Sequence, residues 1–223
     1  EKKVQANLLN LFLSARGKDC LWYGEILKGQ EVVGFDEAVL TVFKREDART
    51  RIGLLDFLSS RSGNAAIPVF REIADSAEPR LLLAMAKTAN RFPLEISRDW
   101  HLERFESLSS PEIKGYALAG LYNGDPVKYL AVISSFLRSK KAEERWAGVI
   151  AAGESRNGVF VGALREILPA EKDLEILCAF FRSLRKLKDP QINDTVLPYL
   201  SHPSEEVRLA ALEAFHIGDD PCL

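Results

Sequence analysis

The chain has 223 residues, of which 47% are hydrophobic, so it is long enough to bury a core as one large domain or two small ones. Lys and Arg total 30 and Asp and Glu total 32, which gives a net charge of −2. This balance excludes the strong positive charge on which phosphate binding depends, so no nucleic acid partner is expected. Cys20, Cys178 and Cys222 are far apart and no CxxC occurs, so no disulfide framework, zinc site or other cofactor is predicted.

The sequence also indicates where the chain resides. No apolar run approaches the roughly 18 residues that a membrane-spanning helix needs, and the N-terminus lacks the pattern of a cleaved signal peptide. Scattered cysteines are typical of a reducing compartment. We therefore expect a cytoplasmic location and no direct membrane insertion. Because the first residue is not Met and residues 219–223 open a pattern that is never completed, we expect a fragment of a longer protein.

Apolar residues recur at helical spacing along the whole chain, and no stretch alternates with a period of two over more than a few residues. Pro, Gly, Ser, Asn and Asp supply start and stop signals between the periodic segments. In chain order, helices are predicted over 4–15, 19–27, 35–43, 50–60, 65–75, 80–90, 94–108, 112–122, 127–137, 143–153, 159–168, 173–187, 190–200 and 205–216.

Boundary residues recur at a nearly constant interval along this series. Repeat starts are predicted at Asp36, Asn64, Phe92, Asp125, Asn157, Asp189 and Asp220, which are 28, 28, 33, 32, 32 and 31 residues apart. Such a period is typical of stacked repeats that bury a continuous core between neighbours. Small residues are predicted where helices approach closely, namely Ala117, Ala147, Gly148, Ala210 and Ala211. Proline stands inside two first helices, Pro68 and Pro198, in a shared pattern that predicts a bend.

The last complete hairpin, and above all VRLAALEAF at 207–215, resembles the HEAT repeat in its short bacterial form. The resemblance implies an all-α fold, an α-α superhelix or HEAT/armadillo-like solenoid of about six to seven helical hairpins. It is weaker before residue 64. We predict a single repeat domain over 1–223, with an irregular N-terminal hairpin (1–35), repeats (36–218) and the start of a truncated repeat (219–223).

Two columns emerge when the second helices are aligned on VRLAAL. One column is basic in five helices: Arg51, Arg80, Lys114, Arg145 and Arg208. The resemblance implies a ladder of hydrogen bonds and ion pairs to the neighbouring repeat, and a line of ligand-binding arginines is the alternative. The next column is largely apolar and holds Ile52, Leu81, Gly115, Trp146 and Leu209, with Ile176 as an addition.

The apolar column allows two interpretations. By the resemblance it faces the concave surface, where an apolar stripe would form a groove for a partner segment; alternatively, curvature buries it between repeats. Trp100, beside His101, is a further candidate because aromatic residues are favoured at interface hot spots, although it could equally be a core residue. The predicted partner-binding residues are Ile52, Leu81, Trp146, Leu209 and Trp100.

Catalytic motifs are missing from the sequence: GxSxG, HExxH, P-loop and GxGxxG patterns do not occur in context. No catalytic, cofactor-binding or metal-binding residues are therefore predicted. We expect a non-catalytic protein–protein interaction scaffold that binds a partner on its concave face. The alternatives are a soluble regulatory domain of a membrane transporter or signalling protein, and a bilin lyase or DNA glycosylase of HEAT type.

Overall fold

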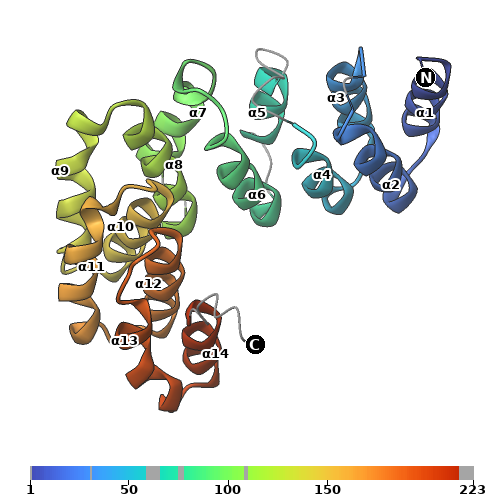
Figure 1. Cartoon of the computed structure of the whole chain (residues 1–223). Helices are drawn as coiled ribbons and strands as arrows, with labels where there is room; N and C mark the ends of the chain where they lie inside the picture. The colour runs from blue at the N-terminus through green and yellow to red at the C-terminus, as the bar shows by residue number, and fades with distance from the viewer. Residues whose placement is uncertain (1, 31, 59–65, 75–77, 108–109, 216–223) are drawn as a thin grey trace. The chain divides into compact units, whose positions relative to one another are not determined.

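The computed structural model describes residues 2–30, 32–58, 66–74, 78–107 and 110–215, and these contain 14 α-helices and no strand (Figure 1). The prediction of an all-helical chain is therefore confirmed. Several predicted features lie outside the described residues. They are the repeat starts at Asn64 and Asp220, the segment 219–223 and Cys222.

The chain divides into two compact units, Glu1–Glu103 and Arg104–Leu223. The first unit holds α1 (Lys2–Ser14), α2 (Gly17–Lys28), α3 (Phe35–Arg45), α4 (Ala48–Leu55), α5 (Ile67–Ala74) and α6 (Pro79–Ala89), and α7 (Leu94–Glu106) begins in it. The second holds α8 (Pro111–Gly124), α9 (Pro126–Leu137), α10 (Ala142–Glu154), α11 (Val161–Ile167), α12 (Leu174–Lys186), α13 (Ile192–Val196) and α14 (Glu205–Ala214). Short 3₁₀ turns at η2 (Gly158–Phe160), η3 (Leu168–Ala170) and η4 (Leu197–Ser201) flank α11 and follow α13. A single repeat domain across both units stays a prediction.

In the first unit, α1 packs on α2 and α3, and α2, α4 and α6 pack in succession. Phe12, Phe35 and Phe57 form an aromatic cluster in which ring centroids lie 5.5 to 6.5 Å apart. All three rings are buried, and tilted pairs at this separation add to the free energy gained from burial. The N-terminal hairpin is therefore tied to the next one through its aromatic core.

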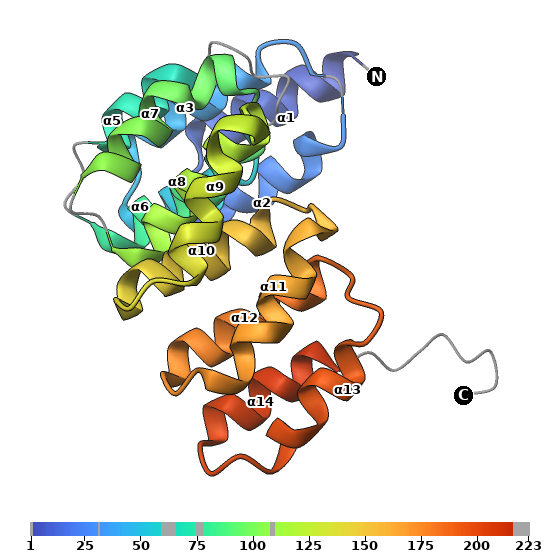
Figure 2. The ribbon, with the colours of Figure 1, turned by 90° about the vertical axis from the view of Figure 1, so that its left-hand side faces the viewer.

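In the second unit, α8, α10, α12 and α14 form a row in which each helix packs on the next (Figures 1 and 2). The intervening helices pack beside this row: α9 on α8 and α10, α11 on α12, and α13 on α12 and α14. Ala117, Ala147, Ala210 and Ala211 are all buried in the row, as predicted for positions of close helix approach. Four second helices of successive hairpins thus lie side by side.

Side-chain caps fix several of the predicted helix starts. Ser110 and Asp125 each stand before a proline at the first helical position, and each accepts a hydrogen bond from the amide three residues later, at 3.3 and 3.1 Å. Asp173 caps α12 by accepting from the amides of Glu175 and Ile176. A cap of this kind satisfies one of the amides that a helix leaves unpaired at its N-terminus.

Both prolines that were predicted to bend helices lie where the type of helix changes. Pro68 is the second residue of α5, which directly follows Ala66 in a 3₁₀ conformation. Pro198 is the second residue of η4, so α13 ends at Val196 and a 3₁₀ turn continues the chain. A bend at these positions stays a prediction. The α4 helix is shorter than predicted, since it ends at Leu55.

Glycines permit the closest contacts between helices of the second unit. A Cβ atom added at Gly148 would lie 2.8 Å from the backbone nitrogen of Leu137, at the junction of α9 and α10. A Cβ at Gly115 would lie 2.8 Å from the carbonyl oxygen of Ala147, between α8 and α10. Backbone cannot move away as a flexible side chain can, so both positions require glycine.

Replacement of Gly148 by alanine is therefore expected to lower the free energy of unfolding by about 2 kcal/mol, because the added methyl group forces the packed backbones of α9 and α10 apart. The matched control is Gly162→Ala, since nothing lies within 4 Å of a Cβ at Gly162 in α11. Because alanine loses less backbone entropy than glycine on folding, the control should be as stable as the wild type or more stable by up to about 1 kcal/mol. Urea denaturation followed by circular dichroism measures both; equal stabilities of the two variants would contradict the packing argument.

Candidate partner-binding groove

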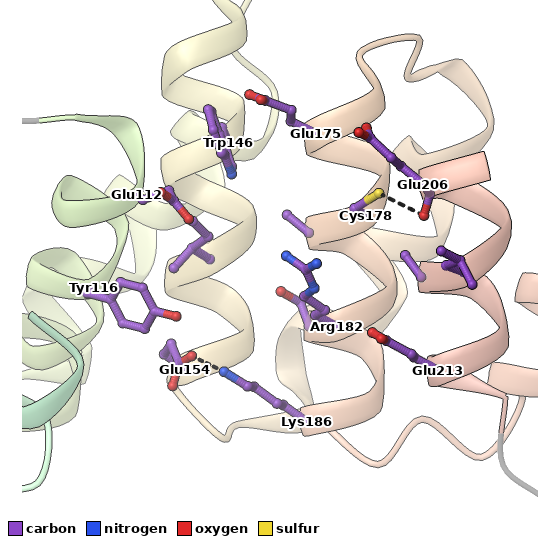
Figure 3. Close-up of a pocket in the computed structure, with 15 residues that line it drawn as sticks. Glu112, Tyr116, Trp146, Glu154, Glu175, Cys178, Arg182, Lys186, Glu206 and Glu213 are labelled. Atoms are coloured by element: carbon purple, nitrogen blue, oxygen red, sulfur yellow. Dashed lines mark hydrogen bonds and ion pairs between the residues drawn. The ribbon is translucent and has the colours of Figure 1, made fainter. Parts of the chain in front are cut away.

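The helix row of the second unit carries a groove of about 460 Å³ (Figure 3). It runs over α8, α10, α12 and α14, so each of the four second helices contributes side chains to it. Its lining residues are Glu112, Tyr116, Trp146, Ile150, Glu154, Glu175, Cys178, Ala179, Arg182, Ser183, Lys186, Glu206, Leu209, Ala210 and Glu213. Five of these are acidic and two are basic.

One end of the groove, which we call the acidic end, consists of Trp146, Glu112, Glu175 and Glu206 (Figure 3). The three glutamates stand in the first turns of α8, α12 and α14. Each directly precedes a buried aliphatic side chain, Ile113, Ile176 or Val207, which holds its helix against the core. This shared register brings the three carboxylates to the same end of the groove, beside the partly exposed indole.

The opposite end of the groove is balanced in charge. Lys186 forms an ion pair with Glu154, joining α12 to α10, and Arg182 and Glu213 add one charge of each sign (Figure 3). Burial, the charges of Glu154 and Glu112 and a hydrogen bond to Glu154 all raise the pKa of Tyr116 above its ordinary value. Its phenol therefore stays protonated at neutral pH and serves as a hydrogen-bond donor.

Cys178 lies between the two ends, and its thiol donates a hydrogen bond to the carbonyl oxygen of Glu206 at 3.7 Å. Burial raises the pKa of this thiol, so it is not a ready thiolate nucleophile. Histidine does not line the groove. Within the part of the chain that the structure describes, no group of three or more His, Cys, Asp or Glu side chains is arranged to hold a metal ion. The groove thus offers contact surface and charge rather than reactive groups.

Of the predicted partner-binding residues, Trp146 and Leu209 both line the groove, and Leu209 is 53% exposed. The other three lie elsewhere. Ile52 is partly exposed in α4 of the first unit, whereas Leu81 and Trp100 are only 2% and 4% exposed. Leu81 and Trp100 are therefore core side chains with little surface to offer a partner. Of the predicted apolar stripe, only Trp146 and Leu209 line the groove, together with charged residues and smaller apolar ones.

The sequence alignment misplaced one helix and overlooked the acidic residues. Ile176 is buried, and Cys178, two residues later, occupies the groove position that corresponds to Trp146 and Leu209. With that shift, a glutamate precedes the first aligned residue in α8, α12 and α14 alike. The recurrence of glutamate at this place was the available signal for the acidic end.

Two of the five residues in the basic column form the predicted ladder contacts. Arg145 donates to both carboxylate oxygens of Glu171, at 2.8 and 3.1 Å, and to the carbonyl oxygens of Ser139 and Lys140. Arg51 likewise bonds the carbonyl oxygens of Lys44 and Glu46 and pairs with Glu72 at 3.3 Å. These two arginines join the turn before their own helix to the following hairpin, whereas Arg208 bonds only the turn before its own helix.

Glu171 shows how these contacts are balanced. Burial acts to raise the pKa of its carboxyl group, but hydrogen bonds from Arg145 and from the amides of Asp173 and Lys172 outweigh that effect. The pKa consequently lies below its ordinary value, and the carboxylate is ionised at neutral pH. The guanidinium of Arg145 is occupied by these structural bonds. It is therefore not free for the alternative role of binding a ligand.

A second hollow, of about 650 Å³, lies in the first unit around the segment between α2 and α3. Backbone and side chains of 28–30 and 32–37 line it, together with Asp56 and Phe57. Lys28 lies over the Phe57 ring at 5.7 Å, so its charge is already engaged there. The hollow brings together no set of groups with a shared chemistry.

No protein-family model, curated protein or solved structure matches the chain. Among the helices that the structure describes, none combines the length and the apolar character needed to cross a membrane.

Proposed function

We propose that the chain is a HEAT-like α-solenoid that acts as a non-catalytic scaffold and binds a segment of a protein partner in the groove over α8, α10, α12 and α14. The single observation that carries this proposal is that partly exposed Trp146 and exposed Leu209 line one groove together with charged residues. Aromatic side chains with a polar surround are typical of binding hot spots. The free thiols of Cys20 and Cys178 suit a cytoplasmic scaffold.

The charge of the groove weighs against the catalytic alternatives. Five carboxylates against two cations repel the phosphates of DNA, so a glycosylase activity in this groove is disfavoured. The protonated thiol of Cys178 and the lack of a lining histidine give a lyase no obvious base or nucleophile. Binding of a protein segment asks only for surface and charge, which the groove supplies.

Peptide selection tests the proposal without assuming what the partner looks like. Random peptides displayed on phage would be selected on the wild-type chain and counter-selected on the double variant Trp146→Asp/Leu209→Asp. We expect peptides that bind the wild type and lose at least about tenfold in affinity on the variant, because two apolar contacts are replaced by charges.

The matched control is Val127→Asp/Leu212→Asp, which alters two residues that are also exposed, in α9 and α14, but do not line the groove. Circular dichroism would verify that both double variants remain folded. Selected peptides should bind the control as tightly as the wild type. If no peptide distinguishes the groove variant from the control, the proposed function is wrong.

A further inference from the structure

The two ends of the groove differ in charge. At the acidic end, Glu112, Glu175 and Glu206 line the groove together with Trp146, and none of the three carboxylates forms an ion pair within the described residues. Elsewhere in the groove, Glu154 pairs with Lys186, and Arg182 and Glu213 carry opposite charges. The net charge of minus three in the lining therefore comes from one end alone.

Three other carboxylates of this unit have cations as partners. Glu171 accepts two hydrogen bonds from Arg145, Asp189 is bonded by Arg165, and Glu154 pairs with Lys186. At the acidic end the positive ends of the helix dipoles offset part of the repulsion among the three glutamates, but they supply no full positive charge. A cation brought by a partner would be attracted by the combined charge of these three carboxylates.

Trp146 favours the same kind of occupant. The face of an indole attracts a Lys or Arg side chain, and it does so more strongly than other aromatic rings do. Glu112 on α8 and Glu175 on α12 belong to the two helices that pack on either side of α10, which carries Trp146. An aromatic face between carboxylates is thus complementary to a basic side chain.

On these grounds we infer that the partner segment is basic and that one of its Lys or Arg side chains lies against Trp146 at the acidic end of the groove. The inference rests on the proposed function, because it names the chemistry of the segment that the groove would bind. It commits to a protein segment rather than to a second copy of this chain.

Three short peptides that share the same apolar positions test the charge preference. Their remaining positions are all Lys in the first, all Gln in the second and all Glu in the third. Fluorescence anisotropy should show the Lys peptide binding at least about tenfold more tightly than the Gln peptide, and the Glu peptide most weakly. The preference should shrink as salt is added, since the glutamates are exposed. Equal binding of the Lys and Gln peptides would overturn the inference.

A charge-reversal variant locates the preference. Glu175→Lys/Glu206→Lys is expected to lose at least about tenfold in affinity for the Lys peptide and to gain affinity for the Glu peptide. The control Glu143→Lys/Glu205→Lys makes the same charge change in the first turns of α10 and α14, outside the groove. Equal losses in both variants would place the attraction in the overall charge and not in the acidic end.

The outcomes separate the two proposals. A Gln peptide that binds as well as the Lys peptide, and is released by Trp146→Asp/Leu209→Asp, would keep the groove as a binding site and reject a basic partner. Failure of all three peptides to bind would reject the basic segment, while the phage selection decides independently whether the groove binds any segment. Self-association of the wild type, lost in the groove variant by sedimentation, would replace the basic segment with a second copy.

Discussion

Replacement of Asp189 by alanine is expected to lower the free energy of unfolding by about 3 kcal/mol. The Asp189 side chain is fully buried, and its carboxylate binds the guanidinium of Arg165, with Nε donating to Oδ2 at 2.8 Å. It also accepts a hydrogen bond from the Gln191 amide at the start of the last complete hairpin. Loss of the carboxylate leaves the Arg165 charge unpaired and an amide unsatisfied. Arg165 is 28% exposed, so water solvates part of its charge once the carboxylate is gone. The expected loss of stability is therefore at the lower end of what breaking a buried ion pair costs.

Asp194 provides the matched control for this prediction. It lies in α13, close to Asp189 in sequence, but it is exposed, so Asp194→Ala should change stability by no more than about 0.5 kcal/mol. Urea denaturation gives both values. A double-mutant cycle with Arg165→Ala should show that the two losses are not additive, since either single change breaks the same pair. Additive losses, or equal stability of the two aspartate variants, would contradict the assigned role.

Acidification is expected to destabilise the chain through His101. This side chain in α7 is 1% exposed, packs edge-on against Trp100, and has no well-formed hydrogen bond from either ring nitrogen to the described residues. Burial lowers the pKa of His101 to about 4, with the nearby Ala89 carbonyl opposing the shift. The unfolded chain therefore takes up a proton near its ordinary pKa of 6.5, whereas the folded chain does not. Stability from this group is present above pH 6.5 and is lost as the pH falls towards 4, by about 3 kcal/mol.

The variant His101→Phe isolates this effect from all other titrations. Its stability at neutral pH will differ from that of the wild type because the packing changes, but the comparison concerns the change between pH 7 and pH 4 in each protein. We expect the wild type to lose about 3 kcal/mol more than the variant over that interval, measured by urea denaturation. Parallel pH profiles of the wild type and His101→Phe would show that His101 is not buried in a neutral form.

Helical periodicity and start signals predicted most of the fold. The Ser110–Pro111 and Asp125–Pro126 pairs begin helices because a side-chain cap and a proline act locally, within one turn. Buried Ala147 and Gly148 were also predictable, since small residues recur where helices approach closely. The end of α4 at Leu55 was missed because helix ends are set by neighbouring turns as much as by periodicity.

The groove was only partly predictable. Trp146 and Leu209 were found because they follow an arginine that is held in the ladder, and that bond fixes the register of α10 and α14. In α12 the corresponding place is held by Leu177, so the sequence offered no arginine from which to count, and Ile176 was chosen instead of Cys178. Trp100 and His101 form a mixed cluster in sequence, but burial depends on the helices that pack around α7, and local pattern does not reveal it.

The row of second helices has a consequence for the sequence of a partner. At the acidic end, each helix supplies one side chain: Glu112, Trp146, Glu175 and Glu206. Packed helices lie about 9 Å apart, a distance that a polyproline II segment covers in one turn of three residues. A ligand that crosses the row in this conformation would meet the helices with basic residues at every third position. The spacing between the helices of this row would then determine the spacing of basic residues in the molecule that binds there.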